Sequence, residues 1–206
     1  MSIAIIGAGA IGSAIARNLA RSGISASIAN SRGPQSLQAL SNELGPYIRA
    51  VSVKEAARAD IVFLAVPWDQ VATVLKDLGP WNARVLVDAN NAVEVRIGVD
   101  NVPSFHAIDF GGRASSELVA QWAPGARVVK AFNHLSAGPL ASGPKVDGGR
   151  RVLFLAGQDA DAKKSVSDLI VRLGFAPVDL GGVDEGRLIQ FPGGPLAVIN
   201  LTQLDQ

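Results

Sequence analysis

The feature that most constrains the fold is a glycine-rich turn, GAGAIG, at residues 7–12. It follows the apolar run 2–6, which is typical of a buried parallel strand, and Ile11, Ile15 and Leu19 then recur at helical spacing. Between a strand and a helix, such a turn lets the backbone approach a pyrophosphate, which the free N–H groups of the helix can bind. The alternative is a purely structural turn. The predicted dinucleotide-binding residues of the turn are Gly7, Ala8, Gly9, Ala10, Ile11 and Gly12.

The rest of the chain alternates short apolar runs with segments of helical period. Further strands are expected at 25–29, 47–53, 60–66, 84–90, 126–133, 151–157 and 176–180. Helical patterns lie between most of them, for example the spacing of Val166, Leu169, Ile170 and Leu173. Strands that alternate with helices, and that are apolar on both faces, predict an α/β fold with a Rossmann-type, doubly wound parallel sheet.

Two domains are expected. Residues 1–135 would form the dinucleotide-binding domain, and residues 136–206 a small C-terminal β-α-β lobe that packs on it and completes an acceptor cleft and dimer contacts. Residues 91–113 show no clear period and predict a long loop. Ser115 or Ser116 is expected to cap the helix that follows this loop.

The second strand ends in Asn30, Ser31 and Arg32, at the place where the adenosine ribose of a dinucleotide lies in this fold. A chain that binds NAD usually has an Asp or Glu there. An acidic residue repels a 2′-phosphate, whereas an arginine binds one through charge-assisted hydrogen bonds. These three residues therefore predict NADP rather than NAD, the alternative being that Arg32 is an ordinary solvated arginine.

Ligands in this fold lie at the carboxyl ends of the strands, so the residues that end the later strands are candidates for the nicotinamide site. An apolar wall is expected from Ala65, Val66, Pro67 and Trp68, and carboxamide contacts from Asn90 and Asn133. Each has a structural alternative, because proline starts helices, tryptophan packs on surfaces and asparagine forms turns.

Acid–base candidates are few. His134 is a weak candidate for a general acid and His106 a weaker one, since a lone loop histidine is more often structural or solvated. The chain has no cysteine, no Y-x-x-x-K arrangement, no metal-ligand cluster and no Ser-His-Asp set. This pattern suggests hydride exchange between two bound redox cofactors, which depends on apposition rather than on a strong acid or base.

Charge and hydropathy exclude several other classes. The net charge of +1 argues against a nucleic-acid or acidic-membrane binder. No stretch of the sequence has the length and apolarity of a membrane span, and the N-terminal segment lacks the basic start of a secretory signal. A cytoplasmic protein is therefore expected.

Six motifs occur in order along the chain: IIGAGAIGSAIARNLA, ANSRGP, FLAVPW, VVKAFN, LFLAGQDADAKK and LGFAPVDLGGVDEGRLIQ. In this series the sequence resembles the coenzyme F-420-dependent NADP oxidoreductase family, and it is similar to the reductase domain of the STEAP metalloreductases. The resemblance implies a homodimer that transfers a hydride between NADP(H) and a deazaflavin (coenzyme F-420) or a flavin such as FMN or FAD. By the same resemblance, the turn at 8–11 would hold the pyrophosphate and Ser31 and Arg32 the 2′-phosphate. The implied acceptor-binding residues are His134, Leu135, Ser136 and Ala137.

Other functions remain open from the sequence. A non-catalytic NADP-sensing or partner-binding module would keep the glycine turn and Arg32 without a second cleft. The β-hydroxyacid dehydrogenases and pyrroline-carboxylate reductases share the opening motif, but they need a helical C-terminal domain, and the C-terminal residues here are expected to form β-α-β. The expected partner is a small-molecule redox acceptor.

Overall fold

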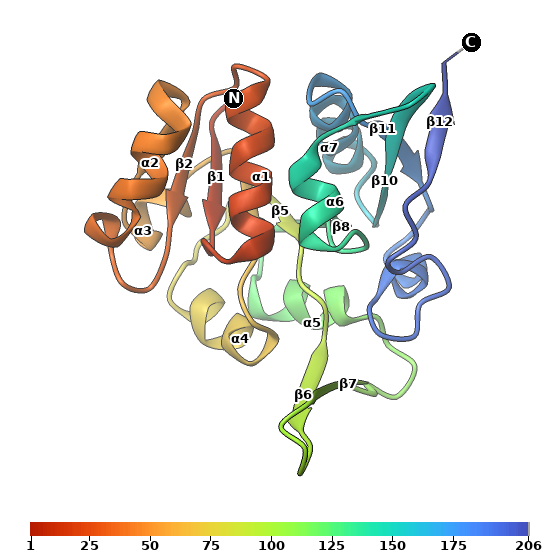
Figure 1. The fold of residues 1–206 in the computed structure, drawn as a ribbon. Coiled ribbons are helices and arrows are strands. Elements are labelled where there is room, and N and C mark those ends of the chain that lie inside the picture. The colour runs from red at the N-terminus through yellow and green to blue at the C-terminus, as the bar shows by residue number, and fades with distance from the viewer. Residues whose placement is uncertain (206) are drawn as a thin grey trace.

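The computed structural model describes residues 1–205, and a twisted sheet runs through the molecule in the strand order β11-β10-β8-β5-β4-β1-β2-β3 (Figure 1). Six neighbouring strands of this order, β8, β5, β4, β1, β2 and β3, are parallel to one another. β10 runs antiparallel to β8, and β11 runs parallel to β10. This arrangement confirms the predicted Rossmann-type α/β fold. The strands of the sheet are β1 (Ile3–Ile6), β2 (Ala26–Ala29), β3 (Ile48–Ala50), β4 (Ile61–Leu64), β5 (Val85–Asp88), β8 (Arg127–Ala131), β10 (Gly149–Gly157) and β11 (Ala176–Asp179), with β9 (Lys145–Val146) and β12 (Thr202–Leu204) paired to β10.

Helices cover both faces of the sheet because every central strand is apolar on both sides. One buried cluster joins Ile5 and Phe63 to apolar side chains of α1, α6 and α7, and a second joins Ala4 and Leu64 to those of α3, α4 and α5. The alternation of neighbouring strand residues between the clusters follows from the two-residue period of a strand. The helices are α1 (Ala10–Arg21), α2 (Gln38–Leu44), α3 (Val53–Ala56), α4 (Trp68–Lys76), α5 (Ser115–Trp122), α6 (Ala137–Ser142) and α7 (Ala160–Arg172), with 3-10 turns η1 (Pro34–Leu37), η2 (Gly45–Tyr47) and η3 (Asp184–Ile189).

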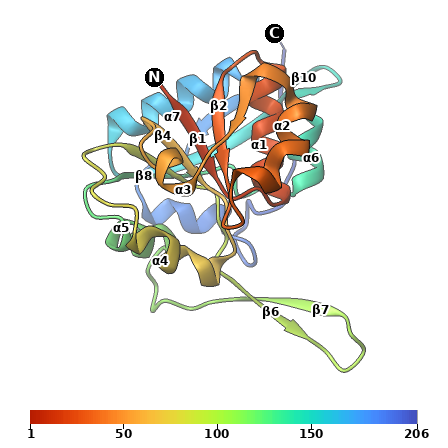
Figure 2. The ribbon, with the colours of Figure 1, turned by 90° about the vertical axis from the view of Figure 1, so that its left-hand side faces the viewer.

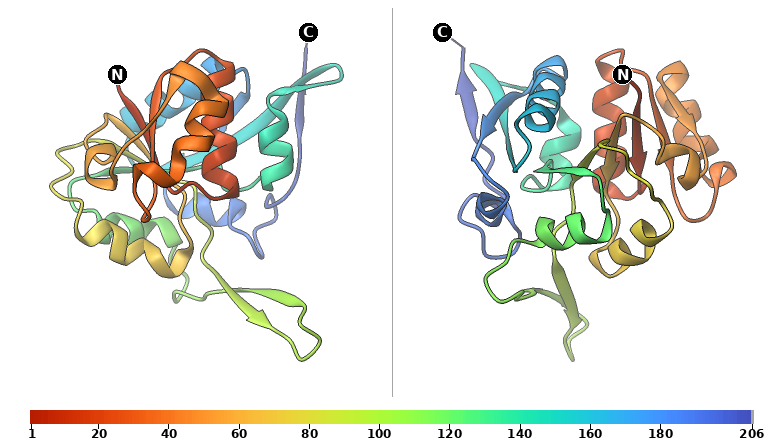
Figure 3. Two further views of the ribbon diagram at one scale, coloured as in Figure 1. Left: turned by 60° about the vertical axis from the view of Figure 1, so that its left-hand side comes forward. Right: turned by 180° about the vertical axis from the view of Figure 1, so that it is seen from behind.

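The predicted long loop at residues 91–113 is wrong, because most of it is a β-hairpin that projects from the body of the molecule (Figures 2 and 3). Its strands are β6 (Val93–Ile97) and β7 (Pro103–Ala107). Val95 lies opposite Phe105, and Glu94 opposite His106, so the ribbon has one apolar and one polar face. The two-residue alternation is present in the sequence. It was missed because it is short and lacks the run of buried residues that marks the other strands.

The C-terminal segment continues the same sheet. β10, α7 and β11 form the predicted β-α-β unit, and α7 packs its apolar residues into the cluster that also holds α1. The division at residue 135 into two domains stays a prediction. No helix among residues 1–205 is both long enough and apolar enough to span a bilayer.

Candidate functional site

The predicted glycine turn joins the end of β1 to the start of α1, and its three glycines differ in their surroundings. A Cβ atom on Gly7, whose φ is +108°, would lie 2.1 Å from the carbonyl oxygen of Ala65. A Cβ on Gly12 would lie 1.9 Å from the carbonyl oxygen of Gly7. A Cβ on Gly9 would meet no atom of residues 1–205 within 4 Å. Backbone packing therefore explains Gly7 and Gly12, whereas the space over Gly9 fits a ligand that approaches the backbone.

The N-terminus of α1 opens onto this space. Gly9 is the N-cap residue, and within the described part of the chain no side chain caps the helix. The first helical hydrogen bond runs from the N–H of Ser13 to the carbonyl of Gly9, at 2.9 Å. The N–H groups of residues 10–12 precede this bond, and such groups can bind a phosphate at a helix N-terminus.

The segment after β2 is held in a fixed turn by Asn30. Its Oδ1 accepts a hydrogen bond from the backbone N–H of Arg32 at 3.0 Å, and its Nδ2 donates to the hydroxyl of Ser36 at 2.9 Å. Arg32 is exposed, and among residues 1–205 its guanidinium has no hydrogen-bond or ion-pair partner. The turn thus presents a cation beside Ser31, an arrangement that suits a 2′-phosphate.

Residues that follow β4 form an apolar wall beside the glycine turn. The N–H of Ala65 donates to the carbonyl of Ile6 at 2.8 Å, and the N–H of Val66 donates to Oδ1 of Asn90 at 2.9 Å. The Asn90 side chain thus holds the backbone of Val66 in place and supports the wall through this hydrogen bond. Pro67 then leads into α4.

These segments meet in one pocket of about 500 Å³, which we call the glycine-turn pocket. Arg32 is the one ionisable side chain among its lining residues, so its walls offer no side chain for general acid–base chemistry. Nine of the residues predicted to bind the cofactor line this pocket: Gly7, Ala8, Gly9, Asn30, Ser31, Arg32, Ala65, Val66 and Pro67. The other six do not line it: Ala10, Ile11, Gly12, Trp68, Asn90 and Asn133.

Trp68 packs against other aromatic rings. Its ring centroid lies 5.6 Å from that of Phe110 and 5.7 Å from that of Trp122. The indole thus joins the first turn of α4 to α5 and to the segment that follows the hairpin.

A buried ion pair joins β5 to β8, and the sequence analysis missed its cationic member, Lys130. Nζ of Lys130 lies 3.1 Å from Oδ2 of Asp88 and donates to the carbonyl of Asn90 at 2.5 Å. Both charged side chains are at most 1% exposed. Burial lowers the pKa of Lys130, and the Asp88 carboxylate acts against that shift. A signal was present, because β8 is apolar around this lysine and Asp88 ends the neighbouring strand.

The same network fixes the N-terminus of α5 and corrects the predicted cap. Ala114 is the N-cap residue, and its N–H donates to Oε1 of Glu117 at 2.7 Å. Ser115 and Ser116 instead turn inward: the hydroxyl of Ser116 donates to Oδ2 of Asp88 at 2.6 Å, and that of Ser115 to Oε1 of Gln190 at 2.9 Å. The serines were misread as caps because partners distant in the sequence take their hydroxyl groups.

Asn133 joins three parts of the chain. Its Nδ2 donates to Oδ1 of Asn91 at 2.9 Å and to the carbonyl of Ile189 at 2.7 Å. Nδ2 of Asn91 donates back to the carbonyl of Asn133 at 2.9 Å. These bonds tie the base of the hairpin to the end of β8 and to η3.

The predicted acceptor residues, 134–137, lie outside the lining of the glycine-turn pocket. His134 is 1% exposed, and its ring packs edge-on against Phe154 at 4.9 Å. Burial lowers its pKa to about 4, although an interaction with the Val152 backbone acts the other way. Leu135 lies in the core, and Ser136 and Ala137 begin α6. The acceptor-binding role of these residues stays a prediction.

The strand order and the glycine turn define the class of Rossmann-type dinucleotide-binding folds. Residues 2–92 match the family model described as NADP oxidoreductase, coenzyme F420-dependent. The solved structure of the hypothetical protein SMa0349 from Sinorhizobium meliloti is 46% identical, with a TM-score of 0.88 over 98% of this chain and 96% of that chain. A structure from Arthrobacter sp. FB24, assigned as an F420-dependent NADP reductase, is 27% identical, with a TM-score of 0.74 over 89% of this chain and 86% of that chain.

Among curated proteins, the metalloreductase STEAP3 of Rattus norvegicus is 28% identical over 190 residues, which is 91% of this chain. The chain spans about a third, 35%, of the length of that relative. Together these comparisons confirm the resemblance to the coenzyme F420-dependent NADP oxidoreductase family that is seen in the motifs of the chain.

Proposed function

We propose that the protein is an enzyme that transfers a hydride between NADPH and a deazaflavin (coenzyme F-420) or flavin-type acceptor such as FMN or FAD. Membership of an NADP-dependent oxidoreductase family supports the cofactor and the reaction type. The observation that carries the proposal is that the open space over Gly9 lies in the same pocket as the guanidinium of Arg32, which has no partner within residues 1–205. They lie where the pyrophosphate and the 2′-phosphate of one dinucleotide would bind in this fold.

Each part of the glycine-turn pocket then has a role. The backbone at Gly9 and the N–H groups that begin α1 hold the pyrophosphate, and Ser31 and Arg32 hold the 2′-phosphate. Val66 and Pro67 exclude water from one face of the nicotinamide, with Val66 fixed by its hydrogen bond to Asn90. The bound cofactor supplies the hydride. A pocket without an acid or base fits transfer between two redox rings, which depends on their apposition.

Replacement of Arg32 tests the cofactor. We expect Arg32→Gln to weaken NADPH binding at least tenfold, about 1.4 kcal/mol, and to leave NADH binding unchanged, because NADH lacks the 2′-phosphate. The dissociation constants of both nucleotides are measured by titration of their fluorescence. Arg49→Gln is the matched control, since Arg49 is also exposed but pairs with Glu55 outside the pocket. An equal loss for NADH and NADPH would refute the phosphate assignment.

Turnover separates the enzyme from a sensor. Purified protein with NADPH is offered coenzyme F-420, FMN, FAD and riboflavin, and loss of NADPH absorbance is recorded. Oxidation with at least one acceptor is expected. Tight NADPH binding without oxidation by any of them would favour the non-catalytic NADP-sensing or partner-binding module.

Two further expectations accompany this proposal, a homodimer and a cytoplasmic location. Both stay predictions. Light scattering coupled to size-exclusion chromatography measures the mass of the particle in solution, and a monomer at micromolar concentration would contradict the homodimer.

A further inference from the structure

A second pocket, of about 280 Å³, lies at the base of the β6–β7 hairpin. Its lining comes from two segments distant in the sequence, residues 92–115 and residues 187–194. It shares no lining residue with the glycine-turn pocket. We call it the arginine pocket, after Arg113 and Arg187 in its walls.

One hydrogen bond brings these two arginines together. Nη1 of Arg187, in η3, donates to the carbonyl of Gly112 at 2.5 Å, and Gly112 precedes Arg113 in the chain. The Nε of Arg187 donates to the carbonyl of Asp184 at 3.2 Å, so part of its guanidinium is left for a ligand. Two cations that border one pocket repel each other unless an anion lies between them.

Two carboxylates lie near this pair, and within residues 1–205 neither accepts a hydrogen bond from a guanidinium. Oε2 of Glu117 lies 3.8 Å from Nε of Arg113, an exposed ion pair, while its Oε1 accepts the N–H of Ala114 at the start of α5. Asp109 also lines the pocket, and its Oδ1 accepts the N–H of Gly111 at 2.9 Å. Both carboxylates thus hold the backbone of the pocket wall, whereas the hydrogen-bond donors of Arg113 have no hydrogen-bond partner within residues 1–205.

Two structural links place the arginine pocket beside the apolar wall that follows β4. Trp68 follows Pro67 of that wall, and its ring lies 5.6 Å from Phe110, which lines the arginine pocket. Asn90, which holds Val66, lies two residues before Ala92, another lining residue. A molecule with a ring over the wall could therefore extend a polar chain toward the arginines.

We infer that the arginine pocket binds the phosphate-bearing chain of the redox acceptor, an inference that rests on the proposed function. The pocket is small beside typical ligand sites of ~300–1,000 Å³, so it suits a tail rather than a whole flavin. Arginine forks match the oxygens of a phosphate in pairs. The acceptor class is thus a flavin or deazaflavin with an anionic tail.

FMN and riboflavin test this inference, because they differ by one phosphate group. Their affinities are measured by fluorescence titration of the full-length protein, with and without NADP⁺, so that the readout is binding rather than turnover. We expect FMN to bind at least tenfold more tightly than riboflavin. We expect Arg113→Gln, and more strongly the Arg113→Gln, Arg187→Gln double variant, to remove this preference and leave NADPH affinity within twofold.

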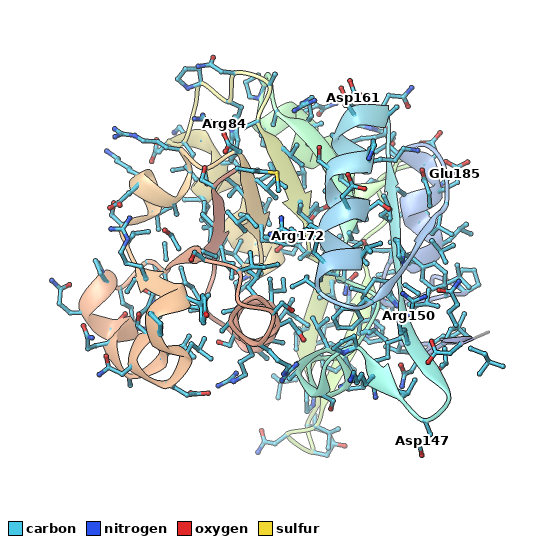
Figure 4. All side chains as sticks on the ribbon, turned by 90° about the horizontal axis from the view of Figure 1, so that it is seen from above. Arg84, Asp147, Arg150, Asp161, Arg172 and Glu185 are labelled. Atoms are coloured by element: carbon cyan, nitrogen blue, oxygen red, sulfur yellow. The ribbon has the colours of Figure 1, made fainter. Side chains whose placement is uncertain are left out.

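The controls separate charge from folding. Arg172→Gln removes one exposed cation from α7, on the side of the molecule that Figure 4 turns toward the viewer, and should keep the preference for FMN. Arg113→Gln breaks no hydrogen bond within residues 1–205 and removes only its exposed ion pair with Glu117, which contributes little to stability. Its melting temperature should therefore match the wild type even if the double variant is less stable.

Three outcomes overturn the inference: equal affinity for the two flavins, no binding of either, or a preference for FMN that survives in the double variant. If NADPH still binds in these cases, the proposed binding of NADPH stands, and only the proposed acceptor site at the arginine pocket fails. If NADPH does not bind the wild type, the proposed function fails first.

Discussion

The glycine-turn pocket and the arginine pocket differ in how the chain builds them. The first is made largely of backbone and small side chains from residues 6–74, where consecutive strands end at one edge of the sheet. The second combines residues 92–115 with residues 187–194, and its polar groups are side chains, among them the long ones of Arg113, Arg187 and Gln190. A short motif can therefore encode the first pocket, whereas the second exists only after the C-terminal segment has packed against the hairpin base.

A buried network contacts a lining residue of each pocket. Lys130 lies 3.1 Å from Asp88 and 3.3 Å from the hydroxyl of Ser115, which lines the arginine pocket. On the other side, Asn90 donates to Asp88 at 2.8 Å and accepts from Val66 of the glycine-turn pocket. The two pockets thus have different walls but a common support.

Removal of this support should have the largest effect. We expect Lys130→Met to lower the free energy of unfolding by about 3–5 kcal/mol, because it leaves the Asp88 carboxylate buried without its cation. Urea denaturation measures the loss. Since the network contacts both pockets, NADPH and FMN should both bind more weakly to the folded variant.

The matched control is Lys163→Met. Lys163 pairs with Asp179 at 2.9 Å, but the Asp179 side chain is 50% exposed. Loss of such a pair should cost about 1 kcal/mol or less and leave both ligands unaffected. Equal losses for the two lysines would show that the Lys130 pair does not support the pockets.

The glycine turn provides a second test, in which neighbouring positions should respond differently. Gly12→Ala should cost about 3 kcal/mol of stability despite the higher helix propensity of alanine, because its Cβ would overlap the carbonyl oxygen of Gly7. Gly9→Ala should cost about 0.5 kcal/mol, as an N-cap change, and weaken NADPH binding at least tenfold, since its Cβ enters the ligand space. Thermal melts and NADPH titration measure the two effects. Full NADPH affinity in Gly9→Ala would show that the dinucleotide does not approach the turn.

Sequence reasoning succeeded for elements whose signal is local. The apolar strands and the turn between β1 and α1 were predicted because their periods and spacings can be read directly from the sequence. The cofactor-binding roles of the turn and of residues 30–32 stay predictions, drawn from where they lie in this fold. The hairpin was missed because its exposed strands lack a run of buried apolar residues. Lys130 was missed because its partner, Asp88, lies on another strand. Ser115 was misread for the same reason, since tertiary contacts decide where a hydroxyl donates.

His134 shows the limit of such reasoning most directly, because a loop position suggested a reactive histidine and the fold buries it. Its folded pKa of about 4 lies below the ordinary value of 6.5, so the neutral ring stabilises the fold above pH 6.5. This stabilisation is lost as the pH falls toward 4. Between pH 7 and pH 5 the wild type should therefore lose about 2 kcal/mol of unfolding free energy through His134.

Urea denaturation at both pH values checks this loss against two variants. His134→Leu cannot bind a proton and should abolish that part of the pH dependence, whereas His106→Leu, a change at an exposed hairpin position, should retain it. If His134→Leu keeps the full pH dependence, the ring is not buried as a neutral group, and His134 becomes available again as an acid beside the acceptor. If the dependence disappears, His134 is a core residue that stays neutral in the folded protein, which argues against its role as an acid beside the acceptor.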